Sequence, residues 1–218
     1  MARRPTADTD SRERMLAAGL DLARQMGLRK LTVRAVAAQA QANLGSFVYH
    51  FGTRDAFVEA LMERLYAPLM AGLALSAAQA PDALAGLRSA LLELVGWVHS
   101  QRQFLAHLLL DAGAGEVGAQ RFLKSMDQRH PVLLLKLIRQ AQAEGRIAAG
   151  DPLHVLMFLM STLAVPVLLF HILGQHPAAP PLARTLDGLA GRPERLEQRL
   201  DWALRGLAPQ SAAALEAS

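Results

Sequence analysis

The apolar residues of this chain recur at the spacing of an α-helix, and this feature limits its fold more than any other. In residues 82–101, Leu84, Leu87, Leu91 and Leu94 return every three or four positions and therefore share one helical face. Hydrophobic residues make up 52% of the 218 residues, whereas aromatic residues make up only 5%. Because Ala and Leu dominate and strand-favouring residues are sparse, the sequence predicts an all-α protein.

Capping residues and helix breakers divide the chain into helices. Thr32, Asn43 and Asp151 are suited to cap helix starts, and Gly27 and Gly52 are suited to end helices. The segment 176–192 is rich in Pro and Gly and is predicted to be a loop, and Pro68 is expected to kink its helix. The expected helices cover residues 11–26, 33–40, 43–51, 53–75, 82–101, 103–112, 116–128, 130–144, 152–175 and 193–207.

The charge of the chain is concentrated near its amino terminus. Residues 1–54 contain nine basic and four acidic residues, so they carry a net charge of +5. The whole chain carries +4, so the remaining 164 residues carry −1. A basic end on a nearly neutral chain indicates a nucleic acid or an anionic surface as partner, although a merely solvated surface would give the same pattern.

The short predicted helix 43–51 has an unusual distribution of side chains. Asn43 can cap it, and Gly45 and Ser46 leave its first turn almost bare, which suits a helix whose backbone must approach another molecule. Phe47 and Phe51 lie four residues apart and can anchor one face in a core. At about 1.5 Å per residue the helix is roughly 12 Å long, which matches the width of the major groove of B-DNA.

The preceding helix and the brief connection between the two predict a helix-turn-helix. Only Gln41 and Ala42 separate helix 33–40 from the cap at Asn43. Tyr49 and His50 point away from the anchoring face and are candidates for base contacts. An ordinary αα-corner is the alternative, because the same spacing also occurs where two helices simply pack.

A pattern of residues runs through the first helices and their turns: Arg14, Met15, Leu16, Ala17, Ala18, Gly27, Leu31, Thr32, Val33, Val36, Ala37, Asn43–Phe47, Tyr49–Phe51 and Thr53–Phe57. With this pattern, residues 11–66 resemble the tetracycline-repressor-like (TetR) family of bacterial transcription regulators. In that family the third helix enters the major groove, and the basic residue that begins the fourth helix contacts phosphate. The resemblance implies that these roles belong here to Asn43, Leu44, Gly45, Ser46, Tyr49, His50 and Arg54, with Thr32 and Arg34 near the DNA backbone.

Two positions depart from the family pattern. Val48 stands where a Tyr is usual, so a hydroxyl expected to contact phosphate is absent. Gln41 stands where the turn commonly has Gly, and a left-handed backbone there would cost about 1 kcal/mol. The details of the half-site therefore do not transfer directly from the family.

The resemblance also implies the organisation of the chain. Proteins of the family dimerise through their last two long helices, here 152–175 and 193–207, and bind a small ligand in the helical body. The predicted organisation is a disordered arm 1–10, a helix-turn-helix DNA-binding domain 11–56, an effector-binding and dimerisation domain 57–208 and a frayed tail 209–218.

The body helices contain residues suited to an apolar cavity for a small apolar or aromatic effector. Such a site needs apolar walls with few polar groups. Each of these residues could instead belong to an ordinary core. The candidates are Trp97, Phe104, His107, Phe122, Met126, Phe158, Met160 and Phe170.

Several other chemistries have weak or no support. Gly113, Gly115 and Gly118 fit G-x-G-x-x-G, but helices flank them where a dinucleotide site needs a strand. The apolar run 155–173 is long enough for a membrane span, yet His, Ser, Thr and Pro interrupt it, and burial in a core and a dimer interface explains it better.

Composition excludes disulfides and gives no reason to expect catalysis. The chain has no Cys, and its seven His residues show no metal-ligand spacing, so we expect no metal, no cofactor and no enzymatic activity. The first residues lack the apolar core of a signal peptide, and a cytoplasmic location is expected.

The sequence therefore favours a homodimeric, ligand-responsive regulator of transcription that binds double-stranded DNA, with repression as the expected sign. The first alternative is a DNA-binding regulator without a small effector that responds to a protein partner. The second is a membrane-associated helical protein that uses residues 155–173.

Overall fold

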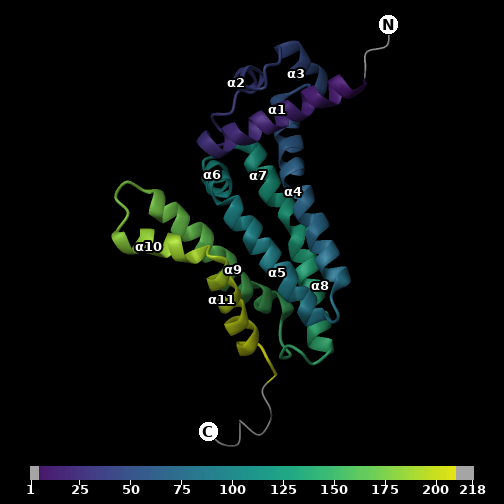
Figure 1. Cartoon of the computed structure of the whole chain (residues 1–218), viewed down its shortest axis with the longest axis vertical. Coiled ribbons are helices and arrows are strands. Elements are labelled where there is room, and N and C mark those ends of the chain that lie inside the picture. Colours follow the sequence, from purple (N-terminus) through teal and green to yellow (C-terminus); the bar gives the residue numbers. More distant parts are fainter. Residues whose placement is uncertain (1–4, 210–218) are drawn as a thin grey trace, which may run out of the picture. The chain divides into compact units, whose positions relative to one another are not determined.

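The computed structural model describes residues 5–209, with side chains described from residue 10 onward (Figure 1). Every regular element in this range is a helix, which confirms the all-α prediction. The elements are α1 (Pro5–Met26), α2 (Val33–Gln39), α3 (Leu44–Phe51), α4 (Arg54–Gln79), α5 (Ala83–Ser100), α6 (Arg102–Gly113), α7 (Val117–Lys124), a 3₁₀ turn (Ser125–Gln128), α8 (His130–Ala143), α9 (Pro152–Gln175), α10 (Pro181–Ala190) and α11 (Pro193–Gly206).

The prediction of a disordered arm 1–10 was partly wrong, and the predicted tail lies almost entirely outside the described residues. Helix α1 begins at Pro5, so residues 5–10, which were predicted to be part of a disordered arm, extend this helix instead. Pro suits a first helical position because its missing N–H has no intrahelical partner there. Residues 1–4 of the predicted arm and 210–218 of the predicted tail lie outside the described residues.

The loop prediction for residues 176–192 was wrong. These residues contain α10, which begins at Pro181 and ends before Gly191. Leu182, Leu186 and Leu189 recur at helical spacing between these breakers. The Pro and Gly residues thus mark the ends of a short helix, and their abundance hid the periodicity inside it.

The chain folds as two compact units. The first comprises the residues up to Pro68 together with Gln103–Ser125, and the second comprises Leu69–Arg102 and the residues from Met126 onward. The boundary therefore lies within α4 at Pro68, the residue that the sequence marked as a kink. Helices α6 and α7 belong to the same unit as the predicted helix-turn-helix. This compact unit is therefore larger than the predicted DNA-binding domain 11–56.

The core of the first unit is aromatic where α3 meets α4. The ring of Phe57 lies 5.1 Å from that of Phe47 and 4.9 Å from that of Phe51. Met15 and Leu16 of α1 are fully or almost fully buried, whereas Leu20 is only half-buried. Figure 1 shows α2 and α3 lying against α1, as expected for a helix-turn-helix with a supporting helix.

In the second unit α5, α8, α9, α10 and α11 pack together (Figure 1). Leu87 and Leu91 of α5 have no exposed surface, and Leu159 and Leu163 of α9 are buried with them. Helix α10 returns along α9, with His171 and Asp187 3.5 Å apart between them.

Helix α9 is the most apolar element. Within the described residues it alone is long and apolar enough to cross a membrane, with a mean hydropathy of 2.3 over Pro152–Gly174. One such helix is weak evidence for a membrane span, because core helices of soluble proteins have the same composition. Only 33% of this apolar window is buried within the chain, however, so much of it faces outward.

Candidate nucleic-acid interface

Local capping fixes where α3 begins and ends. The Asn43 side chain accepts a hydrogen bond from the Ser46 amide at 2.7 Å, which confirms it as the N-cap. Gly52 ends the helix with a φ of +69°, a backbone conformation that glycine adopts without steric cost. Thr53 then caps α4 by accepting from the Ala56 amide at 3.1 Å.

The two faces of α3 are sharply different. Phe47 and Phe51 are buried, as their spacing predicted. On the rest of the helix surface Tyr49 is 75% exposed, Val48 58% and Leu44 46%, and Gly45 is also exposed; of these, Gly45 and Tyr49 lie opposite the buried pair. The helix therefore presents a small surface that combines a bare first turn with one aromatic and two aliphatic side chains.

The turn between α2 and α3 is a Schellman motif that ends in a left-handed residue. The Ala42 amide donates to the Ala37 carbonyl at 2.9 Å, and the Gln41 amide donates to the Ala38 carbonyl at 3.1 Å. Gln41 has a φ of +51° and therefore adopts the left-handed backbone conformation for which Gly is usual at this position of the turn. A non-glycine residue is thus strained at the point that sets the angle between the two helices.

Other predicted DNA-contact residues lie at the margin of this surface. The hydroxyl of Ser46 is 3.3 Å from that of Ser11 on α1 and so faces partly inward. His50 is half-buried, with its ring edge-on to Tyr49 at a centroid separation of 5.1 Å. Thr32 is exposed but uses its hydroxyl to cap α2, accepting from the Ala35 amide at 3.1 Å.

Cationic side chains lie at the start of α2. Arg34 is exposed and forms no hydrogen bond or ion pair with any described residue. Arg29 and Lys30, in the turn before α2, are exposed as well. They were counted in the basic surplus of the sequence but were not singled out as site residues, because no helical pattern assigns a face to a turn.

Arg54 begins α4, as the resemblance implies, and its guanidinium is bound to other residues of the same unit. Its Nε donates to the Leu31 carbonyl at 3.0 Å, and Nη2 donates to the Leu28 carbonyl. Its Nη1 lies 3.0 Å from Oε1 of Glu116, whose side chain is only 6% exposed. The guanidinium thus holds the 28–31 turn to α4 and to the start of α7, and this geometry favours a structural role over a phosphate contact.

A second carboxylate holds the same turn. Oδ2 of Asp111 at the end of α6 accepts from the Leu28 amide at 2.6 Å and from the Arg29 amide at 3.3 Å. Glu116 also caps α7 by accepting from the Ala119 amide at 2.6 Å. Because α6 and α7 supply both carboxylates, the turn before α2 is fixed by residues that follow it by more than eighty positions in sequence.

The structure divides the predicted effector-site residues. Phe104, His107 and Phe122 belong to the first unit, where Phe104 and Phe122 are buried. Of the residues in the second unit, Phe170 lines an open cavity between α9, α10 and α11, and the others do not. The residues in the second unit are Trp97, Met126, Phe158, Met160 and Phe170.

Comparison with known proteins agrees with this geometry. Residues 15–61 match the family model described as bacterial regulatory proteins of the tetR family. A search of curated proteins found no match.

Several solved structures share the fold. The ketosteroid transcriptional regulator KstR2 of Mycobacterium tuberculosis is 19% identical, with a TM-score of 0.62 over 91% of this chain and 95% of its own. The TetR family regulator PfmR from Thermus thermophilus is 17% identical, with a TM-score of 0.63 over 88% and 98% of the two chains. A tetR-family protein from Rhodococcus is 14% identical, with a TM-score of 0.65 over 92% and 98%.

At these identities the solved structures establish the fold, and the matched sequence establishes what kind of amino-terminal unit it contains. That unit has a capped helix-turn-helix with an exposed second helix. Residues 15–61 therefore form a DNA-binding unit of the tetR type, and the chain as a whole has the fold of solved TetR-family regulators.

Proposed function

We propose that the protein is a homodimeric, ligand-responsive repressor that acts in the cytoplasm and binds a near-palindromic operator. Each protomer would place α3 in the major groove of one half-site. The observation that carries this proposal is the exposed face of α3, with Tyr49 75% exposed opposite the buried Phe47.

The exposed face suits base contacts. Leu44 and Val48 can contact thymine methyl groups, and the Tyr49 hydroxyl can exchange a hydrogen bond with a base edge or a phosphate. The exposed Gly45 lets the backbone of the first turn approach the DNA without a side chain between them. Asn43, Ser46 and His50, at the margin of this face, would adjust these contacts.

Phosphate contacts would come from the start of α2. Arg34, Arg29 and Lys30 are exposed there, and cations of this kind contribute affinity that does not depend on sequence. Thr32 caps the same helix and lies exposed beside them. Arg54 would act indirectly, by fixing the turn that carries these cations.

The outward face of α9 supports dimerisation. Leu153, Met157, Val165 and Leu169 are each between 46% and 61% exposed and repeat at four- or eight-residue intervals, so they form a stripe that winds around the helix. Exposed apolar surface of this extent marks an interaction site. We place a second copy of the chain there, with the adjoining α11 also contributing.

A small effector would regulate DNA binding by favouring one of two conformations of the dimer, to the extent of its different affinity for them. An apolar compound suits the largely apolar second unit. The likeness of the fold to a protein named as a ketosteroid regulator also supports an apolar effector, although at only 19% identity.

Selection of bound DNA from a random pool tests the proposal. We expect the full chain to enrich a near-palindrome and to bind it as one dimer. The centres of the two half-sites should be about 34–36 Å apart, or a multiple of that distance. Binding to the selected duplex should exceed binding to a scrambled duplex by at least about a thousandfold at physiological salt. A monomeric protein, or equal affinity for both duplexes, would refute the proposal.

A further inference from the structure

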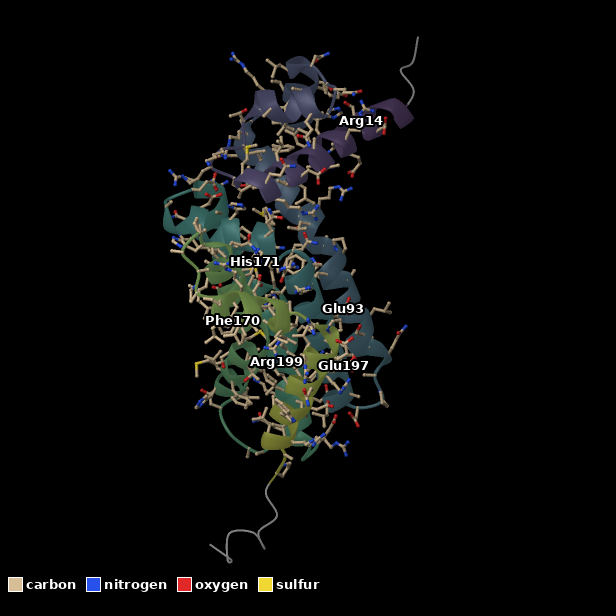
Figure 2. The ribbon with its side chains drawn as sticks, turned by 60° about the vertical axis from the view of Figure 1, so that its left-hand side comes forward. Arg14, Glu93, Phe170, His171, Glu197 and Arg199 are labelled. Carbon is tan, nitrogen blue, oxygen red and sulfur yellow. The ribbon has the colours of Figure 1, made fainter. Side chains whose placement is uncertain are left out.

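The second unit contains an open cavity of about 330 Å³ between α9, α10 and α11. One part of its wall is apolar and is formed by Phe170, Leu186, Leu189 and Trp202. The other part is cationic and is formed by Arg195 and Arg199. Figure 2 labels Phe170 on α9 and Arg199 on α11, which belong to the two parts of this wall.

Arg199 is partly withdrawn from water, and its hydrogen-bond partners among the described residues are neutral. Its Nη1 donates to the Thr162 carbonyl at 3.4 Å and its Nη2 to the Ala190 carbonyl. Its Nε is buried and has no hydrogen-bond partner within the described part of the chain. Two carbonyl oxygens therefore serve a group that offers five N–H donors and carries a full charge.

Among the described residues, no carboxylate neutralises Arg199 directly. The residues that line the cavity include no Asp or Glu, and no described carboxylate forms an ion pair with Arg199. Arg195 uses its Nη1 to donate to the Gln198 side chain at 3.0 Å, which is also neutral. Burial lowers the pKa of Arg199, because desolvation penalises its charged form.

Shape and charge together define a ligand class. A partly buried guanidinium beside apolar side chains is suited to a carboxylate attached to an apolar tail, because bidentate Arg–carboxylate pairs are strong and directional. At about 30 Å³ for each water-sized group, the cavity holds roughly eleven non-hydrogen atoms.

We propose that this cavity between α9, α10 and α11 is a binding site for a small amphiphilic carboxylate, with Arg199 holding the carboxylate and Phe170, Leu189 and Trp202 enclosing the tail. The inference deepens the proposed function, since it rests on ligand responsiveness and names the class of effector. It also moves the effector site away from most of the aromatic residues suggested by the sequence.

Octanoate is a suitable probe because it has a seven-carbon apolar tail attached to a carboxylate, about ten non-hydrogen atoms in all. It is titrated into the full-length protein without DNA, in a W97F background in which Trp202 is the sole Trp. Fluorescence of Trp202 and the melting temperature report binding. We expect saturable octanoate binding that is at least about tenfold tighter than binding of octanol or octylammonium.

Variants of one helix provide the matched comparison. R199Q should weaken octanoate binding about tenfold and leave octanol binding unchanged. R205Q, which changes an exposed Arg on the same helix outside the cavity, should leave both unchanged. L189Q, at a side chain that is 37% exposed and therefore tolerant of change, should weaken both probes.

Three results would overturn the inference. The first is equal binding of the three probes, and the second is unaltered octanoate binding by folded R199Q. The third is a pair of observations: octanoate never changes the fluorescence of Trp202, and W202A dissociates the dimer. A second copy of the chain would then fill the cavity. DNA selection without octanoate is measured separately, so failure here is distinguishable from failure of the DNA-binding proposal.

Discussion

Helices α3 and α9 both expose apolar side chains and neither contains Asp, Glu, Lys or Arg, but they differ in length and in the cations that precede them. Helix α3 has eight residues, with Gly45 and Tyr49 on its exposed face and the exposed cations Arg29, Lys30 and Arg34 at the start of the helix before it. Helix α9 has 24 residues and contains no Asp, Glu, Lys or Arg.

This difference teaches that exposed apolar residues alone do not identify a partner. A short helix with a bare turn and cations nearby fits the groove and phosphates of DNA. A long uncharged stripe fits another apolar protein surface, because depletion of charge is typical of the centre of an interface. The predictions below test this division, from the largest expected effect to the smallest.

The largest effect should come from placing a charge in the α9 stripe. L169E would bury a carboxylate in the proposed dimer interface and should weaken dimerisation by about 2–4 kcal/mol, or roughly 30- to 1,000-fold. Sedimentation equilibrium measures the change. L75E alters another exposed Leu, on α4, and should leave the dimer intact; equal dissociation in both variants would remove α9 as the interface.

The next largest effect should come from the exposed face of α3. Y49A should weaken binding to a selected operator by roughly tenfold to hundredfold, and binding to random DNA by less than about twofold, because base contacts specify whereas phosphate contacts do not. Fluorescence anisotropy over a salt series gives both affinities. Y49F isolates the hydroxyl group.

In the same assay, substitution of Arg34 should lower the affinity for both DNAs and not for the operator alone. R34Q should weaken both DNAs alike and reduce the salt slope by about one. If Y49A and R34Q instead lower both affinities in parallel, α3 does not read sequence.

A stability effect should follow from the carboxylate that holds the DNA-binding unit. E116Q removes the buried carboxylate that pairs with Arg54 at 3.0 Å and leaves only the exposed Asp55 at 3.9 Å, so it should lower the free energy of unfolding by about 2 kcal/mol. The matched variant is E59Q, which breaks the exposed Glu59–Arg121 pair and should cost less than about 1 kcal/mol. Urea unfolding compares the two, and equal losses would contradict the structural role of Arg54.

The smallest effect lies in the turn that orients α3. Q41G relieves a positive φ and should raise the free energy of unfolding by about 0.5–1 kcal/mol. Q39G, in the last turn of α2, should instead lower it by about 0.5–1 kcal/mol. A loss of stability in Q41G would mean that the Gln41 side chain contributes more than its backbone strain costs.

Several elements followed directly from local rules. The N-caps at Thr32, Asn43 and Asp151 are those of the structure, because capping depends only on a side chain and the next few amides. The anchors Phe47 and Phe51 are buried because four-residue spacing places them on one helical face. Helix α10 was missed because the Pro and Gly residues at and around its ends drew attention away from the helical spacing of its Leu residues.

The sequence by itself determined the helical class, the helix-turn-helix and its exposed second helix, since these depend on periodicity and capping over a few residues. Only the tertiary structure decided the contacts of Arg54 and the place of the cavity between α9, α10 and α11. Glu116, which pairs with Arg54, follows it by 62 positions, and Arg199 meets carbonyls of Thr162 and Ala190 on other helices. Such contacts depend on how helices pack against one another, and no local pattern encodes which distant side chains that packing brings together.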